Sequence, residues 1–388
     1  MRTDPPPRGP APDVDGPRLG QGDLDPDQVA AEVAGAVGLA EGPAGVRAVL
    51  RALAGGAGST RAVGRETALP LPLVAAVCGE LRARGVLTAD RPGRLTAAGA
   101  AAFGGAPVKV SDVDRAGLAA ALEDAAAAVP LVRVELDQTH CTVPTKVRRV
   151  LAMHEAGAIA GRRVLVLGDD DLVSVALAVL AERHGIVPAS LTVVEVDPAL
   201  VGFLRSRLAG APFPVAVLEH DLRAPLELDG PVDAVQTDPP YTVDGAGLFL
   251  ERAAAVLRPG ADVFLSLGVR RPAETVRLQE VLCRLGLAVR SMTPGFNEYV
   301  GAGVLGGTSA LWHLVAAAPA ETMTATVYTG AGRSRRRYAC VGCGTVQTVG
   351  EGRRWRTVGE LKQAGCPRCG GRTFQPRSRR GQGAARAR

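Results

Sequence analysis

The sequence predicts an α/β fold, in which a mostly parallel seven-stranded sheet carries helices on both faces and lies between two smaller modules. Short apolar runs alternate with helical patterns across residues 161–318, which is typical of parallel strands joined by helices. Acidic residues follow several of these runs, where doubly wound sheets bind their ligands. Two CxxC pairs near the end of the chain predict a separate metal module.

Length and composition indicate several domains and an uneven charge. At 388 residues with 47% hydrophobic content, the chain is long enough for two or more cores. The net charge of +6 divides sharply, because residues 333–388 contain 15 Arg/Lys and 2 Asp/Glu. Residues 1–332 therefore carry a net negative charge. A basic tail of this kind is suited to nucleic-acid phosphates or to a solvated surface, and both interpretations stay open.

The location of the protein follows from what the sequence lacks. It contains no apolar run of membrane-spanning length, and its first residues are rich in Pro and Asp rather than signal-like. Its seven cysteines do not form a secreted disulfide pattern. We therefore expect a cytoplasmic protein without membrane contact.

The N-terminal part is predicted to be a disordered tail, residues 1–26, followed by a winged-helix domain, residues 27–104. Helical patterns surround Val46–Leu53, begin again at Ser59, and recur at Val74–Leu81, ahead of a hairpin wing at residues 86–96. The third helix would read a DNA groove, but it offers few basic side chains. A structural role, with homodimerisation through this region, is therefore favoured over DNA binding.

Residues 105–160 are predicted to connect the winged helix to the sheet. They contain an alanine-rich helix over residues 116–128, a polar stretch over residues 137–145, and a helix over residues 146–156. We assign the polar stretch to the acceptor side of the site.

Residues 161–318 are predicted to be the catalytic domain. The seven expected strands are Arg163–Leu167, Leu191–Val196, Val215–Leu218, Val232–Thr237, Asp262–Leu267, Leu287–Ser291 and Ala310–Ala316. Helices are expected over Leu172–His184, from Pro198, over Gly247–Leu257 and over Ala273–Leu285. This order matches a class I methyltransferase-like Rossmann fold.

Two acidic strings follow the first and fourth predicted strands. The first is Gly168-Asp169-Asp170-Asp171-Leu172, and the second is Thr237-Asp238-Pro239-Pro240-Tyr241-Thr242. These strands flank the point where the strand order reverses, so the strings should form opposite walls of one pocket. A pocket with this much negative charge suits a cation.

Acidic residues at the next two strand ends complete an expected adenosyl site. Glu195, in Val194-Glu195-Val196-Asp197, can accept hydrogen bonds from both ribose hydroxyls. Asp221, after the third strand, can receive an adenine amino group. The residues assigned to the adenosyl co-substrate are Gly168, Asp169, Asp170, Glu195, Asp197, Asp221 and Pro239.

The two acidic strings resemble the paired motifs of the branched-chain polyamine synthases, the N(4)-bis(aminopropyl)spermidine synthase family. Asp137-Gln138 with Thr142, Thr145 and Arg148-Arg149 is similar to that family's segment before the first strand. Phe296-Asn297-Glu298-Tyr299 is similar to a segment near its last strands. The resemblance covers roughly residues 43–318 and implies aminopropyl transfer from decarboxylated S-adenosylmethionine to spermidine. The products would be branched polyamines and methylthioadenosine.

The resemblance also implies catalytic roles. It places the family's key acid at Asp171, with Asp238 as second choice and Tyr241 as an orienting hydroxyl. Donor and acceptor are both cations, and the attacking amine must lose a proton to a nearby carboxylate.

The second string alone permits a different enzyme. Asp-Pro-Pro-Tyr is typical of S-adenosylmethionine-dependent amino-methyltransferases acting on DNA or RNA bases. Three carboxylates at Asp169–Asp171 would repel the carboxylate of S-adenosylmethionine, which the decarboxylated donor lacks. A third hypothesis is a transcription regulator that senses an adenosyl metabolite.

Residues 319–388 are predicted to be a basic tail holding a zinc ribbon over residues 338–374. The cysteines form CxxC-x22-CxxC, and four thiolates are the ligand set of a closed structural Zn²⁺ site. The ligands would be Cys340, Cys343, Cys366 and Cys369.

Overall fold

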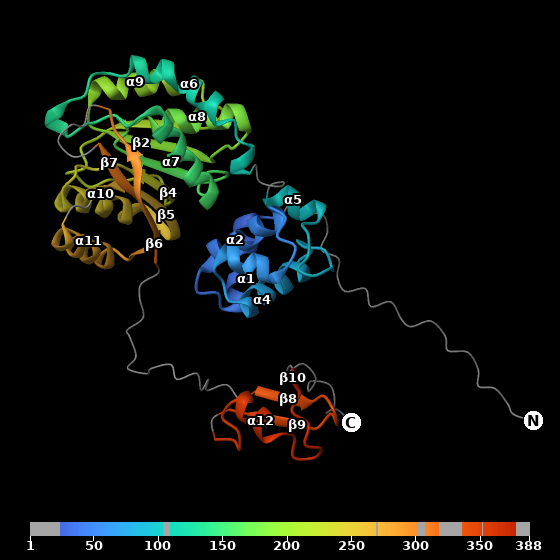
Figure 1. The fold of residues 1–388 in the computed structure, drawn as a ribbon. Helices are drawn as coiled ribbons and strands as arrows, with labels where there is room; N and C mark the ends of the chain where they lie inside the picture. Colours follow the sequence, from blue (N-terminus) through green and yellow to red (C-terminus); the bar gives the residue numbers. More distant parts are fainter. Residues whose placement is uncertain are drawn as a thin grey trace, which may run out of the picture. The chain divides into compact units, whose positions relative to one another are not determined.

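The computed structural model describes residues 24–103, 109–268, 271–300, 307–317, 336–350 and 352–377. The chain divides into two compact units, residues 1–320 and 321–388, which are treated separately below (Figure 1). The predicted disordered tail lies almost entirely outside the described residues.

A seven-stranded sheet forms the centre of the first unit. Its strands are β1 (Arg163–Leu167), β2 (Ser190–Glu195), β3 (Val215–Glu219), β4 (Val232–Thr237), β5 (Leu257–Leu267), β6 (Leu287–Glu298) and β7 (Thr308–Ala316). Their order is β3-β2-β1-β4-β5-β7-β6. The first five strands run parallel, and β7 is antiparallel to both neighbours. The predicted Rossmann topology is therefore confirmed.

Helices cover both faces of this sheet, as Figure 1 shows. One layer contains α6 (Arg115–Ala128), α7 (Val143–Ala156), α8 (Val173–His184) and α9 (Pro198–Leu208). The other contains α10 (Val243–Val256) and α11 (Pro272–Arg284). Alternate β1 side chains serve the two layers: Val164 and Val166 belong to one apolar core, whereas Leu165 and Leu167 belong to the other.

The N-terminal part is helical and encloses its own core. It contains α1 (Pro26–Val37), α2 (Gly42–Ala54), α3 (Thr60–Thr67), α4 (Leu71–Ala83) and α5 (Ala97–Phe103). A short antiparallel pairing joins Leu87 to Leu95, at the position of the expected wing. The elements lie where the sequence predicts them, and the winged-helix assignment stays a prediction. No single described helix is long and apolar enough to cross a membrane, although α1 and α2 pass such a test together, with a bend of 106°.

The second unit is small and built around its cysteines. Its three-stranded antiparallel sheet has the order β10-β8-β9, from β8 (Arg336–Cys340), β9 (Val346–Val349) and β10 (Phe374–Arg377), beside helix α12 (Val358–Ala364). The core contains Cys340, Val349, Trp355, Leu361, Cys366 and Phe374.

Candidate active site

The two acidic strings begin side by side. Strands β1 and β4 are parallel neighbours, and Leu167 pairs with Thr237 at their carboxyl ends. The Thr237 hydroxyl donates a hydrogen bond of 2.9 Å to the Leu167 carbonyl. The residues that follow, Gly168 and Asp238, therefore leave the sheet at the same edge.

The first string forms a tight turn into α8. Gly168 has φ +67°, a left-handed conformation that glycine adopts without strain, and buried Leu172 has φ +55°. The Asp169 carboxylate accepts hydrogen bonds from the Val173 amide, at 2.7 Å, and from the Ser174 hydroxyl. Burial raises the pKa of Asp169 to about 7, although these hydrogen bonds oppose the rise. In the described structure Asp169 caps α8, and its assigned contact with the co-substrate stays a prediction.

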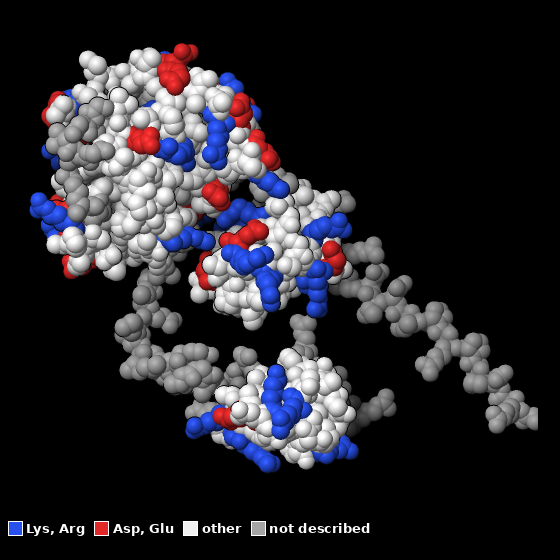
Figure 2. All heavy atoms as spheres, viewed as in Figure 1, with Lys and Arg blue, Asp and Glu red and all other residues white. Residues whose placement is uncertain are grey.

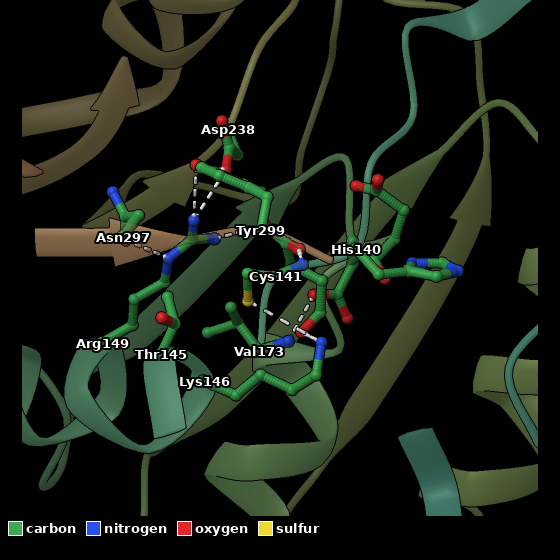
Figure 3. Close-up of polar contacts among 12 residues, drawn as sticks. His140, Cys141, Thr145, Lys146, Arg149, Val173, Asp238, Asn297 and Tyr299 are labelled. Atoms are coloured by element: carbon green, nitrogen blue, oxygen red, sulfur yellow. Dashed lines mark hydrogen bonds and ion pairs between the residues drawn. The ribbon is translucent and has the colours of Figure 1, made fainter. Parts of the chain in front are cut away.

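A buried arginine of α7 connects the two strings. Arg149 is only 1% exposed, and Figure 3 shows its guanidinium next to Asp238, Asn297 and Tyr299. Its nitrogens lie 2.5 Å from Asp171 Oδ2, 2.6 Å from Asp238 Oδ2, 2.8 Å from Asn297 Oδ1 and 3.1 Å from the Tyr299 hydroxyl. One side chain thus joins β1, β4 and β6 to α7.

Asp171 is held by cations and backbone. Besides Arg149, its carboxylate accepts a hydrogen bond of 2.5 Å from the Cys141 amide, while buried Lys146 donates to the Asp171 carbonyl at 2.9 Å. Burial alone would raise the pKa of Asp171, but Arg149 and Lys146 hold it well below its usual range. Arg149 thus favours the ionised form of Asp171.

Asp170 has different surroundings. It faces a small cavity and accepts a 2.9 Å hydrogen bond from the Thr139 amide. Burial, followed by the charges of Asp171 and Asp238, raises its pKa well above the usual range. The described residues place no Lys or Arg within ion-pair distance of Asp170, so it differs from Asp171 although the two are adjacent in sequence.

The cavity brings together three carboxylates from three segments. Its lining residues are Asp137, Thr139, Asp170, Asp238, Pro239, Tyr241, Tyr299, Gly307 and Thr308. Asp137 accepts a hydrogen bond of 3.1 Å from the Tyr241 amide, which fixes the polar stretch before α7 against the second string. The same stretch pairs with the end of β6, where the Thr142 amide donates to the Glu298 carbonyl at 2.8 Å. A negatively charged cavity of this kind suits an amine.

Asp238 and Tyr241 line the cavity from the second string. Burial raises the pKa of Asp238 to about 7; Arg149 opposes this rise, and Asp171 adds to it. The Tyr299 hydroxyl donates to Asp238 Oδ2 at 2.6 Å, whereas Asp238 Oδ1 is buried without a hydrogen-bond partner among the described residues. Burial, followed by the charge of Asp238, raises the pKa of Tyr241, so its hydroxyl stays protonated. One carboxylate oxygen is thus left for a ligand.

The remaining assigned residues lie at the ends of β2 and β3. Glu195 is buried and accepts backbone hydrogen bonds from Asp169, at 2.9 Å, and from Val196, at 2.8 Å. Asp197 caps α9 and also accepts a 3.3 Å hydrogen bond from the Gln138 side chain. Asp221 is more exposed and pairs with Arg223, whose hydrogen bonds lower the pKa of Asp221 to about 2. Their roles at an adenosyl group stay predictions.

Four residues at the centre of the site were absent from the predicted set: Lys146, Arg149, Asn297 and Tyr299. In the sequence, Arg149 and the Phe296–Tyr299 stretch stand out only by their resemblance to family segments. Lys146 and Arg149 are three positions apart on α7, and two basic residues at this spacing are typical of an exposed helix face. The sequence pattern therefore does not predict that they are buried.

The four cysteines of the second unit converge as predicted. One ligand atom from each lies within 4.8 Å of all the others, and the Sγ atoms of Cys340 and Cys369 are 3.6 Å apart. Four sulfurs at this spacing fit a tetrahedral Zn²⁺ ion.

Comparison with known proteins identifies the family. The family model of the branched-chain polyamine synthase A C-terminal domain matches residues 118–335, which is more than half of the chain. The chain belongs to the branched-chain polyamine synthase family.

Individual curated proteins and one solved structure are similar to parts of this chain. An uncharacterised protein of Methanocaldococcus jannaschii is 32% identical over 253 residues, covering 63% of this chain and 61% of the relative. The N(4)-bis(aminopropyl)spermidine synthase of Thermococcus kodakarensis is 32% identical over 189 residues, covering 47% and 52%. The chain thus spans about half to three fifths of the length of these curated relatives. A branched-chain polyamine synthase structure from Thermus thermophilus aligns with 25% identity and a TM-score of 0.49, covering 77% of this chain and 94% of that one.

Proposed function

We propose that this family member transfers aminopropyl groups from decarboxylated S-adenosylmethionine to the internal amine of spermidine, releasing methylthioadenosine. The observation that carries the proposal is the cavity where Asp137, Asp170 and Asp238 meet at the carboxyl ends of β1 and β4. The name of the Thermococcus kodakarensis relative, N(4)-bis(aminopropyl)spermidine synthase, supports the substrate class.

The proposed reaction is a single displacement. The neutral acceptor nitrogen attacks the aminopropyl carbon that is bound to the donor sulfonium. A carbon–nitrogen bond forms, the carbon–sulfur bond breaks, and its electron pair neutralises the sulfur. The acceptor nitrogen loses one proton, which a carboxylate takes up. The protein therefore has to align two cations and provide that carboxylate.

Asp170 is better suited than Asp171 to take up the proton. An ordinary ammonium has a pKa of about 10 and an ordinary Asp about 4, so the proton would move uphill by about 8 kcal/mol. The raised pKa of Asp170 narrows this gap, whereas the lowered pKa of Asp171 widens it. Asp170 also lines the cavity. We therefore assign proton uptake to Asp170 and the anchoring of Arg149 to Asp171, in place of the sequence-based choice of Asp171.

Asp238 and Tyr241 would then hold the acceptor. Asp238 Oδ1 is free to accept a hydrogen bond from an amine, and the Tyr241 ring borders the same cavity. Gly168, Asp169, Glu195, Asp197, Asp221 and Pro239 keep their proposed place around the donor.

Product analysis tests the proposal directly. The protein is incubated with spermidine and decarboxylated S-adenosylmethionine, and separately with S-adenosylmethionine and nucleic acid, and products are identified by mass spectrometry. We expect aminopropylated spermidine and methylthioadenosine in the first mixture only. A methylated base without aminopropylated amine would refute the proposal.

We further propose that the cysteine cluster holds one structural zinc ion. The exposed basic residues of the second unit include Arg337, Arg353, Arg354, Arg356 and Arg368, and Figure 2 shows basic side chains gathered on its visible face. This surface supports the proposed contact with nucleic-acid phosphates. A homodimer through the winged-helix region and a cytoplasmic location stay predictions.

A further inference from the structure

Arg149 links three segments of the site to helix α7. Its guanidinium contacts one residue after β1, one after β4 and two at the end of β6, while its backbone belongs to α7. These partners lie 22, 89 and about 150 positions away in sequence. None of the other contacts described at this site joins as many segments.

The guanidinium also lies between two carboxylates that would otherwise repel each other. Asp171 and Asp238 share it at 2.5 and 2.6 Å, and both side chains are less than 10% exposed. A planar guanidinium with several N–H groups can bridge two carboxylates, whereas the single ammonium of a lysine on a shorter side chain cannot reach both in the same way.

We propose that Arg149 is a positioning residue of this active site, which bridges Asp171 and Asp238 and so fixes the spacing of the two acidic strings. Arg149 contacts no cavity residue except Asp238 and Tyr299, so it acts through them and not on substrate. Asp171 and Asp170 are then assigned different tasks. Asp171 is the anchor of Arg149, whereas Asp170, which no described Lys or Arg pairs with, takes up the proton.

Several charged or titratable side chains surround Arg149 and its two carboxylate partners. The titratable or charged side chains around the guanidinium and its partners are Cys141, Lys146, Asp170, Asp171, Glu195, Asp238, Tyr241 and Tyr299. Lys146 also carries positive charge, but it hydrogen-bonds the Asp171 carbonyl rather than its carboxylate. Among these side chains, Arg149 is thus the cation that directly contacts the Asp171 carboxylate.

The chain offers a matched control in Arg148. This neighbour also joins α7 to β6, because it donates a 2.9 Å hydrogen bond to the Phe296 carbonyl. It contacts neither acidic string, and its nearest carboxylate is Glu298 at 3.6 Å. Arg148→Gln therefore removes a link between α7 and β6 but leaves the Arg149 bridge between the two carboxylates intact.

The test compares wild type, Arg149→Gln, Arg149→Lys and Arg148→Gln. The Asp171 carboxyl is followed from pH 3 to 9 by 13C NMR, with Asp171→Asn for assignment. We expect no titration of Asp171 above pH 4 in wild type and Arg148→Gln, and a midpoint at least one unit higher in Arg149→Gln. Thermal melting checks folding; should Arg149→Gln not fold, Arg149→Gln with Asp238→Asn is compared with Asp238→Asn alone.

Kinetics supplies the second readout and rests on the proposed aminopropyl transfer. Arg149→Lys retains the charge but not the bridge, so kcat should fall at least tenfold with a smaller change in KM, while Arg148→Gln stays close to wild type. Unchanged Asp171 titration in Arg149→Gln, or wild-type kcat in Arg149→Lys, would overturn the proposal. If wild type transfers no aminopropyl group, the proposed function fails, and the titration still decides the role of Arg149.

Discussion

Replacing each of two adjacent aspartates with asparagine separates proton uptake from anchoring. Asp170 faces the cavity, and no Lys or Arg among the described residues lies within ion-pair distance of it, whereas Asp171 binds Arg149 at 2.5 Å in a buried pair. Asparagine retains the shape of the side chain and can still accept the Thr139 or Cys141 amide hydrogen. The two substitutions thus remove the same charge from different electrostatic surroundings.

We expect Asp170→Asn to lower mainly turnover and Asp171→Asn to lower mainly stability. Loss of a general base lowers turnover by about 10²–10⁴-fold, and we expect this for Asp170→Asn. Its stability should be unchanged or slightly higher, because a half-buried carboxylate that no described Lys or Arg pairs with is removed. Asp171→Asn leaves Arg149 with one carboxylate fewer, and breaking a buried ion pair costs about 3–5 kcal/mol. For a domain of this size that lowers Tm by roughly 6–20 °C.

Two measurements decide between these roles. Single-turnover aminopropyl transfer from decarboxylated S-adenosylmethionine gives the chemical step, and thermal melting gives the stability of the same samples. Turnover of Asp170→Asn within a factor of ten of wild type would refute the assignment of proton uptake. A stable Asp171→Asn with a large loss of turnover would return that role to Asp171.

Three further predictions follow from individual contacts. Asp169 and Asp238 have pKa values raised to about 7, so the folded ligand-free protein binds more protons than the unfolded chain between about pH 4 and 7. The free energy of unfolding should therefore fall as pH rises through this window, by up to about 1.4 kcal/mol per pH unit for each group. Measured by denaturant unfolding at several pH values, this free energy should change less with pH in Asp238→Asn than in wild type. Ser174→Ala removes a hydroxyl that donates to Asp169 and should cost about 1 kcal/mol in the same experiment; an unchanged midpoint would contradict the capping role. Zinc removal by a chelator should expose buried Trp355 and shift its fluorescence to longer wavelength, whereas metal-free protein with unchanged emission would exclude a structural ion.

The fold could be predicted closely because its signals are local. Strands β1 and β4 were predicted at the bounds observed, since each is a short run that contains Val residues and is followed by a turn with Gly or Pro. Strand β6 was predicted too short, because its second half is mostly exposed and contains Pro294 and Gly295. This extension carries Asn297 to the site.

The site could be predicted only in part because its decisive contacts are distant in sequence. The adjacency of Asp171 and Asp238 follows from strand order, which a sequence pattern can indicate. The burial of Arg149 depends on four partners gathered by the whole sheet, and its basic side chain alone favours an exposed position. The different roles proposed for Asp170 and Asp171 depend on the contact between Arg149 and Asp171.

The insertion of β7 between β5 and β6 has a consequence for how the enzyme is completed during synthesis. Asn297 and Tyr299 belong to the edge side of the sheet, and β6 is attached to it only through β7, which ends at Ala316. A nascent chain that has emerged as far as residue 300 therefore contains both acidic strings and Arg149 but lacks the strand that pairs β6 with the rest of the sheet. Because such pairing over long sequence distances forms late, the charged centre should be assembled last, after the parallel strands have already associated.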